Sequence, residues 1–127
     1  MKEFITTDQA PAAIGTYSQA VPHRGTLYIS GQIPLDPETM EIVADDFRQQ
    51  ISQVLDNLDA ICRAAEVSLN DVIKFTVYLT ELDNFPLVNE AMQTRLSQPF
   101  PARAVVEVSA LPKGVAVEID AVVDLTP

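Results

Sequence analysis

The sequence has one cysteine, one histidine and no tryptophan among its 127 residues. Because Cys62 is the only cysteine, no disulfide can form within the chain. A structural zinc site usually takes four Cys or His ligands, which Cys62 and His23 cannot provide, so we expect no metal. A Ser-His-Asp or Cys-His nucleophile would depend on His23, which stands beside Arg24-Gly25 in a predicted turn, and we do not favour it.

Basic residues and long apolar runs are also scarce. Eight Lys and Arg stand against 18 Asp and Glu, which gives a net charge of −10 and a pI near 4.2. Nucleic acids and anionic membranes are bound through clusters of Lys and Arg, so this balance disfavours both partners. No apolar run approaches the roughly 20 residues of a membrane span, and residues 1–5 lack the apolar stretch of a signal peptide. We therefore predict a cytoplasmic protein.

Apolar residues make up 47% of the sequence. This is enough for one domain over residues 1–127 with a hydrophobic core. The most regular segment begins after Asp45 or Asp46, either of which offers a helix N-cap. Apolar residues then recur at helical spacing, which predicts a helix that buries one stripe: Phe47, Ile51, Val54, Leu55, Leu58, Ile61, Cys62 and Ala65. The opposite, exposed face is predicted to carry Gln49, Gln53, Asp56, Asn57 and Arg63.

The rest of the chain alternates between predicted strands and one further helix. The second helix is predicted to be capped by Asp83 or Asn84 and to end before Pro99. Residues rich in β-branched and aromatic types predict strands at 27–30, 72–79, 103–109 and 115–124, with short strands at 2–7 and 41–43. This order predicts an α+β sandwich of two layers, with two helices on one face of a mixed sheet. Oligomerisation is the economical way to cover the other face.

Two charged residues stand out on the last two strands. Alternation places Arg103 on one strand with Val105 and Glu107, and it places Glu118 on the next. A solvated face, or an exposed ion pair contributing at most about 1 kcal/mol, would account for both residues. Alternatively, the Arg103 guanidinium could grip a substrate carboxylate through two hydrogen bonds while Glu118 orients a water molecule. That pair would suit hydrolysis of a small α-substituted acid without a cofactor.

Several ordered motifs resemble one family along nearly the whole chain. They are the opening Ala10-Pro11-Ala12-Ala13-Ile14-Gly15-Thr16-Tyr17-Ser18-Gln19-Ala20, Ser30-Gly31-Gln32-Ile33-Pro34, Asp83-Asn84-Phe85 with Val88-Asn89, Pro101-Ala102-Arg103 with Leu111-Pro112, and Val117-Glu118-Ile119-Asp120-Ala121. Together they resemble the Rid (YjgF-type) reactive-intermediate deaminases. Four ordered motifs at the spacing of the family make the combined match far more specific than any single short motif.

The resemblance implies a chorismate-mutase-like α+β fold, assembled as a homotrimer with three clefts between neighbouring subunits. Members of the RidA branch hydrolyse 2-iminobutanoate and 2-iminopropanoate to 2-oxo acids and ammonia, with no metal or cofactor. By the same resemblance Arg103 would bind the substrate carboxylate, Glu118 would orient or activate water, and Tyr17 would close the cleft. Glu118 near Arg103 would tend to stay ionised, unless burial counteracts the effect of the arginine. The other implied positions line the pocket or support the subunit contact: Ser30, Gly31, Val105, Asn89 and Phe85.

Four positions depart from the family pattern, and two other functions stay open. Thr16 replaces a frequent Pro, Val105 a frequent Cys, and Met92 and Leu96 stand where aromatic residues are frequent. Val105 is expected to act through its backbone N–H, so activity should survive. The first alternative is a non-catalytic trimer that binds small 2-oxo acids, and the second is a ribonuclease or translation inhibitor, which the charge disfavours.

Overall fold

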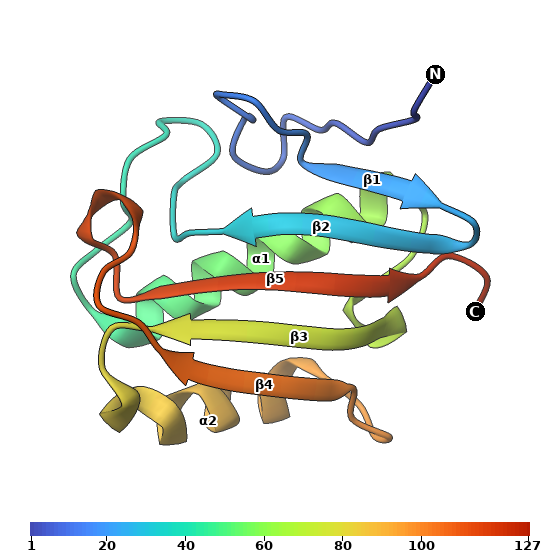
Figure 1. Ribbon diagram of the computed structural model, residues 1–127. Coiled ribbons are helices and arrows are strands. Elements are labelled where there is room, and N and C mark those ends of the chain that lie inside the picture. Colours follow the sequence, from blue (N-terminus) through green and yellow to red (C-terminus); the bar gives the residue numbers. More distant parts are fainter.

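The chain forms two layers, a five-stranded sheet and two helices behind it (Figure 1). A computed structural model describes all of residues 1–127. In chain order the strands and helices are β1 (Ala20–His23), β2 (Thr26–Gln32), α1 (Phe47–Ala64), β3 (Val72–Leu79), α2 (Phe85–Arg95), β4 (Ala102–Glu107) and β5 (Val117–Asp124). Short 3₁₀ turns lie at Leu69–Asp71, Leu82–Asn84 and Pro112–Gly114. The predicted α+β sandwich is confirmed.

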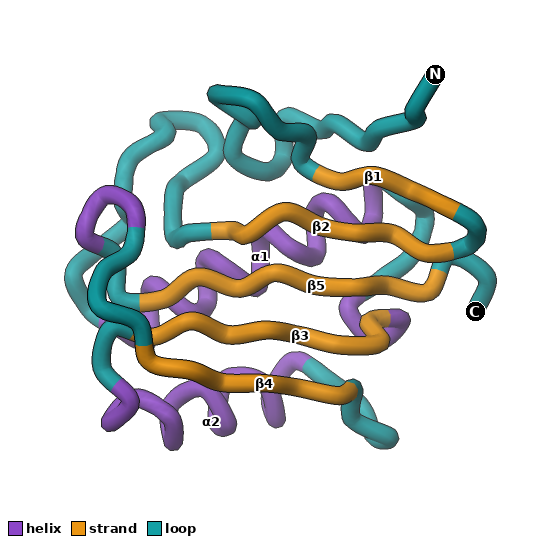
Figure 2. The backbone as a smooth tube through the Cα atoms, in the orientation of Figure 1, coloured by secondary structure: helices purple, strands orange, loops and turns teal.

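The sheet is mixed, with the strand order β1-β2-β5-β3-β4 (Figure 2). Every pair is antiparallel except β3 and β4, which α2 connects as a parallel crossover. β4 is therefore an edge strand, and α2 lies directly beside it. Both helices cover the same face, and the other face, which we call the open face, has no covering layer.

Helix α1 follows its predicted pattern closely. The Asp46 side chain caps it by accepting a hydrogen bond from the backbone N–H of Gln49. The apolar stripe enters a core cluster of 23 buried residues, together with the inward side chains of β3 and β5. One assignment on this helix was wrong, because Asn57 is fully buried rather than exposed. Burial of Cys62 raises the pKa of its thiol to about 12, as expected for a core residue.

Helix α2 begins at Phe85 with Pro86 in its first turn, and Val88, Met92 and Leu96 face the core. The prediction of a side-chain cap for this helix is wrong. Asn84 precedes the helix but its side chain makes no capping hydrogen bond. A 3₁₀ turn leads straight into α2, so helical backbone geometry already exists when the helix begins.

The shorter predicted strands are reduced to single bridges. Ile5 pairs with Ala20 alone, and Ile42 pairs with Leu35 alone, while β1 has no counterpart among the predictions. On β3, a register irregularity lies between Val72 and Lys74, so Val72 is buried and Ile73 is exposed, against simple alternation. No helix in the structure has the length and apolar character needed to cross a bilayer.

Candidate active site

The sheet holds Arg103 and Glu118 on opposite faces. Arg103 is paired in register with Phe75, whose side chain is fully buried under the helices. Glu118 is paired with Tyr78 on the open face, and its neighbours Val117 and Ile119 point into the core. Side chains alternate along a strand, so the two charged groups cannot meet within one chain.

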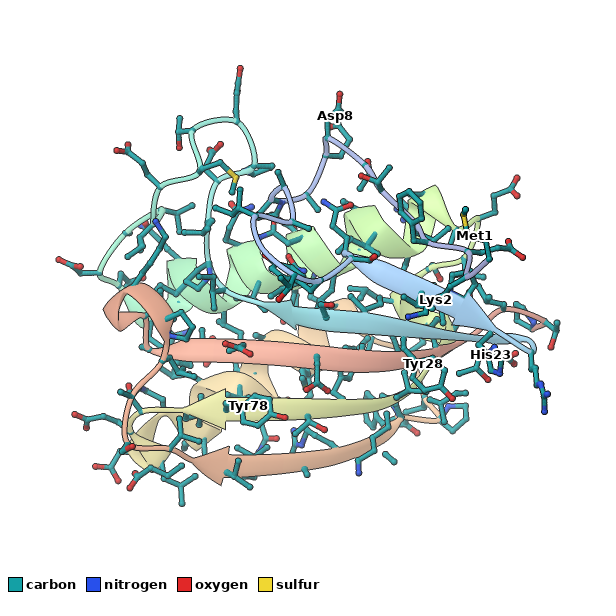
Figure 3. The ribbon with its side chains drawn as sticks, turned by 45° about the horizontal axis from the view of Figure 1, so that its top comes forward. Met1, Lys2, Asp8, His23, Tyr28 and Tyr78 are labelled. Atoms are coloured by element: carbon teal, nitrogen blue, oxygen red, sulfur yellow. The ribbon has the colours of Figure 1, made fainter.

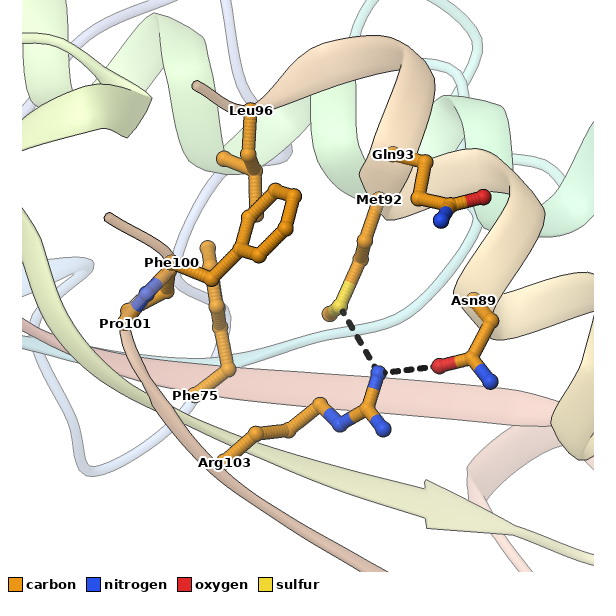
Figure 4. Close-up of a pocket in the computed structure, with 8 residues that line it drawn as sticks. All are labelled: Phe75, Asn89, Met92, Gln93, Leu96, Phe100, Pro101 and Arg103. Carbon is orange, nitrogen blue, oxygen red and sulfur yellow. Dashed lines mark hydrogen bonds between the residues drawn. The ribbon is translucent and has the colours of Figure 1, made fainter. Parts of the chain in front are cut away.

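Arg103 lines a cavity of about 530 Å³ between β4 and α2 (Figure 4). Its guanidinium nitrogen donates to Oδ1 of Asn89 at 2.7 Å and lies 3.8 Å from the sulfur of Met92. The guanidinium carbon also lies 5.1 Å from the centre of the Phe85 ring, within the range of a cation–π contact. Asn89 and Phe85 therefore orient the cation.

No carboxylate of the chain neutralises this guanidinium. The three ion pairs involve the arginines of the two helices: Arg48 with Glu90, Arg63 with Asp59, and Arg95 with Asp56. An arginine presents five N–H donors in a fixed fork, and the contacts with Asn89 and Met92 use only part of that capacity. Arg103 is exposed and thus offers a preorganised, unpaired cation to an external carboxylate.

Glu118 lies in a second cavity, of about 520 Å³, between the open face and the loops that precede β1 and follow β2. Tyr17, Ser30, Gly31 and Lys113 also line it, and Lys113 is its only cation. The Glu118 carboxyl rests directly over Gly31. A β-carbon added at Gly31 would stand 2.9 Å from Cδ of Glu118 and closer still to Oε2. The absence of a side chain at Gly31 makes the room for this carboxyl.

The surroundings of Glu118 favour its protonated form. Partial burial raises its pKa, and the negative charge of Asp120, two residues along the same face, raises it further. The Tyr78 hydroxyl donates to Oδ2 of Asp120 at 2.9 Å (Figure 3 labels Tyr78 on this face). Arg103 lies on the other face of the sheet, so within one chain it does not offset this rise in the pKa of Glu118.

Tyr17 and Ser30 reach the Glu118 cavity in different ways. Tyr17 comes from the loop before β1, and its half-exposed ring lies at the mouth of the cavity. The Ser30 hydroxyl donates to the backbone oxygen of Ser18 at 2.6 Å, so it ties that loop to β2. Val105 lies on the edge strand, on the same face as Arg103, and is half-buried.

Sequence reasoning missed the four buried polar side chains, which are all carboxamides: Gln19, Gln32, Gln50 and Asn57. The most connected of them is Gln19. Its Oε1 accepts from the Thr7 N–H at 2.7 Å, and its Nε2 donates to the carbonyls of Thr7, Ala10 and Pro11 at 3.0, 3.3 and 2.8 Å. It thereby fixes the segment that forms one wall of the Glu118 cavity.

The carboxamides of α1 fix the opposite walls. Asn57 donates to the carbonyl of Leu35 at 3.0 Å, and both Leu35 and Ile33 line the cavity. Gln50 accepts from the N–H of Ala116 at 2.9 Å and donates to the carbonyl of Ala44 at 2.8 Å. Residues 50, 54, 57 and 61 follow helical spacing, which places Gln50 and Asn57 on the same face as Val54 and Ile61. Polarity alone had assigned Asn57 to the surface.

A Gln19→Leu variant is expected to lose about 2–3 kcal/mol of unfolding free energy, because it leaves several buried backbone groups without partners. Chemical unfolding at a fixed protein concentration measures this loss. Gln49→Leu, an exposed change on α1, is the control and should stay within about 0.5 kcal/mol. A loss below about 1 kcal/mol for Gln19→Leu would show that the loop is held by other contacts.

A Gly31→Ala variant is expected to lower any activity that uses Glu118 by about tenfold or more, because the carboxyl must leave its place over Gly31. The backbone at Gly31 does not adopt a positive φ, so alanine itself introduces no backbone strain. In a Glu118→Ala background the same change should leave the melting temperature unchanged, and a drop there would assign the effect to the backbone.

No group of three or more His, Cys, Asp or Glu side chains is placed to share a metal ion. The two cavities instead offer hydrogen-bonding and charged groups, a cation in one and a partly buried carboxyl in the other. Such groups can bind an anionic organic molecule and move protons to or from it.

The profile of the family described as Endoribonuclease L-PSP matches residues 7–125. The chain belongs to this family, which is the YjgF/Rid family. It is 52% identical to a RutC family protein of Pyrococcus horikoshii, over 96% of this chain and 97% of that protein. It is 44% identical to the mouse 2-iminobutanoate/2-iminopropanoate deaminase, over 96% of this chain and 90% of that one.

Among solved structures, the fold is similar to that of RidA from an Antarctic Psychrobacter species. The TM-score is 0.93 at 55% sequence identity, over 96% of this chain and 98% of that chain. The predicted membership of the Rid family is therefore confirmed. Some members of this family that resemble the chain are named deaminases and others carry only a family name.

Proposed function

We propose that the protein hydrolyses 2-imino acids, among them 2-iminobutanoate and 2-iminopropanoate, to 2-oxo acids and ammonia, in clefts shared by neighbouring copies of a homotrimer. The observation that carries the proposal is the unpaired, oriented guanidinium of Arg103 on one face of the sheet, with the partly buried carboxyl of Glu118 on the other. A trimer would bring the Arg103 face of one copy against the Glu118 cavity of the next.

The open face supports the shared cleft. It has no covering layer, and it exposes apolar side chains such as Tyr28 and Val106. Beside it, β4 leaves one edge of the sheet without a neighbouring strand. Apolar surface and a free strand edge are features that a second copy of the chain would cover.

The proposed reaction needs positioning more than covalent help, because a protonated imine is already electrophilic. Arg103 would hold the substrate carboxylate, with the backbone N–H of Val105 as a second contact. The carboxylate form of Glu118 from the neighbouring copy would take a proton from water as the oxygen adds to the imine carbon. Glu118 would then give this proton to the nitrogen of the resulting carbinolamine, the carbon–nitrogen bond would break to release ammonia, and the Glu118 carboxylate would take the hydroxyl proton as the carbonyl of the 2-oxo acid forms.

The remaining residues have supporting roles in this proposal. Asn89 and Phe85 would hold the guanidinium, Tyr17 would close the cleft, and Gly31 would leave room for the Glu118 carboxyl. The Ser30 hydroxyl is bonded to the Tyr17 loop, so Ser30 would act by positioning that loop. A raised pKa suits Glu118 to both accepting and returning a proton.

A coupled assay tests the activity. A threonine dehydratase would release 2-iminobutanoate, and semicarbazide would trap the imine that escapes hydrolysis. The expected result is that the protein suppresses semicarbazone formation in proportion to its concentration, while a heated sample has no effect. Undiminished semicarbazone at a molar excess of protein would contradict the proposal.

A second candidate is a non-catalytic protein that binds 2-oxo acids. The observation in its favour is that the cavity beside Arg103 is lined by residues of one chain and does not include Glu118, so carboxylate binding does not need Glu118. Calorimetry with 2-oxobutanoate, which should bind in either case, separates the two candidates when it is combined with the coupled assay. Binding without hydrolysis would favour this second function.

RNA cleavage is the third candidate, because the family description names an endoribonuclease. The net charge of −10 opposes binding to a polyanion, and Lys113 is the only cation that lines the Glu118 cavity. We expect no cleavage of a labelled RNA by nuclease-free protein. Cleavage that Arg103→Ala abolishes would favour this third function instead.

A further inference from the structure

The cavity beside Arg103 has one polar end and one apolar end. Arg103, Asn89 and Gln93 form the polar end. The other walls are apolar, and the close-up shows the Phe100 ring, the Leu96 side chain and the Met92 thioether facing the same space as the guanidinium (Figure 4). No acidic side chain lines this cavity. An anionic head with an apolar tail fits such a division of polar and apolar walls.

The volume of this cavity exceeds what a four-carbon imino acid requires. At about 530 Å³ it is partly open to solvent and lies within the size range of pockets that hold drug-sized ligands. A carboxylate held by Arg103 would leave the ethyl group of 2-iminobutanoate next to a space that is still largely hydrated. A larger apolar side chain would displace this water and reach the walls formed by Met92 and Phe100.

The walls are also suited to variable shapes. Met92 is unbranched and packs well against irregular or aromatic groups. Phe100 lies in the loop between α2 and β4 and is 49% exposed, so its ring lies at the mouth of the cavity rather than in the core. The exposed face of this phenylalanine has no other partner in the chain, which is consistent with contact to a bound molecule.

We propose that this cavity is a side-chain pocket that makes the enzyme select 2-imino acids with apolar side chains larger than ethyl, such as those formed by oxidation of leucine, methionine or phenylalanine. The inference rests on the proposed function, since it assigns a substrate class to the same site. The pocket consists of Met92, Leu96, Phe100 and Pro101, with Phe75 at its base.

The first test compares two imines of different size. An amino acid oxidase acting on alanine or leucine would release the corresponding imines in the presence of catalase, with semicarbazide as the trap. We expect the second-order rate constant for the leucine-derived imine to exceed that for the alanine-derived imine by at least about tenfold, the lower end of the effect of one methylene in a closed pocket. Equal rates, or faster hydrolysis of the smaller imine, would overturn the inference.

The second test alters the walls of the pocket. Phe100→Ala should reduce the leucine-to-alanine rate ratio to near one, and Phe100→Trp, which places a larger ring at the mouth of the cavity, should reduce it below one. Phe4→Ala is the matched control, because Phe4 is also exposed but lines neither cavity. An unchanged ratio in both pocket variants would place the side chain of the substrate elsewhere.

Binding of 2-oxo acids separates a failure of this inference from a failure of the proposed function. Calorimetry would compare 4-methyl-2-oxopentanoate with pyruvate, in wild type and in Phe100→Ala. Tighter binding of the larger acid that Phe100→Ala removes would support the pocket even if no imine were hydrolysed. Hydrolysis of both imines combined with equal affinity for both 2-oxo acids would preserve the deaminase and overturn the pocket.

Discussion

Arg103→Ala and Glu118→Gln proteins are each expected to lose imine hydrolysis by about 100-fold or more, and an equimolar mixture of the two is expected to regain about a quarter of it. The reason is that the two groups lie on opposite faces of one sheet. A working cleft must take Arg103 from one copy and Glu118 from another. In a random mixture half of the copies retain each residue, so about one cleft in four is intact.

The experiment is sharpest when the copies are mixed by co-refolding and compared with a second mixture. Wild type combined with an Arg103→Ala/Glu118→Gln double variant should also give about a quarter of the activity, because intact clefts again need two intact copies. A site complete within one chain would behave differently. It would give about half of the activity in the second mixture and none in the first, and that result would contradict the shared cleft.

Glu118→Gln alone is expected to separate catalysis from binding. Replacing a group that takes and returns a proton typically lowers the rate 10²- to 10⁴-fold. The affinity for 2-oxobutanoate should change by only a few-fold, because Arg103 and its supports Asn89 and Phe85 remain. Single-turnover hydrolysis and calorimetry on the same preparation measure the two effects. Unchanged hydrolysis would remove Glu118 from the mechanism.

The acidity of Glu118 adds a pH dependence with a definite sign. Hydrolysis that needs the carboxylate should fall as the pH drops through the pKa of Glu118, and burial together with Asp120 places that pKa above the ordinary value for glutamate. Asp120→Asn removes a nearby negative charge, so the fall in activity on the acid side of the pH–rate profile (the acid limb) should move to lower pH. Tyr78 and Lys113 also face this region. Lys113→Met is the control of opposite sign, because the loss of a nearby positive charge should move the fall in activity to higher pH. A limb that stays in place would assign it to another group.

The sequence predicted the parts of the fold whose patterns are long. Helix α1 repeats its apolar spacing over five turns, and β3 is rich in β-branched and aromatic residues, so each was predicted nearly to its ends. The predicted strands at 2–7 and 41–43 are too short to carry such a pattern, and each keeps only one bridge. β1 escaped prediction because its four residues include Pro22 and His23, which are not typical of strands.

For the site, alternation correctly grouped Arg103 with Val105 and Glu107, and Glu118 with Asp120. On β5 the apolar side marks the covered face, but β4 carries valines on both sides, so the sequence does not show which face holds Arg103. The family motifs indicated which residues matter, but not what each one touches. The bond from Ser30 to Ser18 depends on contacts between distant parts of the chain, as do the bonds made by Gln19.

The buried polar side chains of this protein are all amides, and the one buried thiol, Cys62, holds its proton to a pKa of about 12. The fully buried side chains therefore carry no charge near neutral pH, in spite of an acidic exterior. Mild acidification should leave the hydrogen bonds of Gln19, Gln50 and Asn57 in place, since none of these bonds involves a titrating group. A loss of turnover in that range would then report the chemistry of the cleft rather than the melting of its walls.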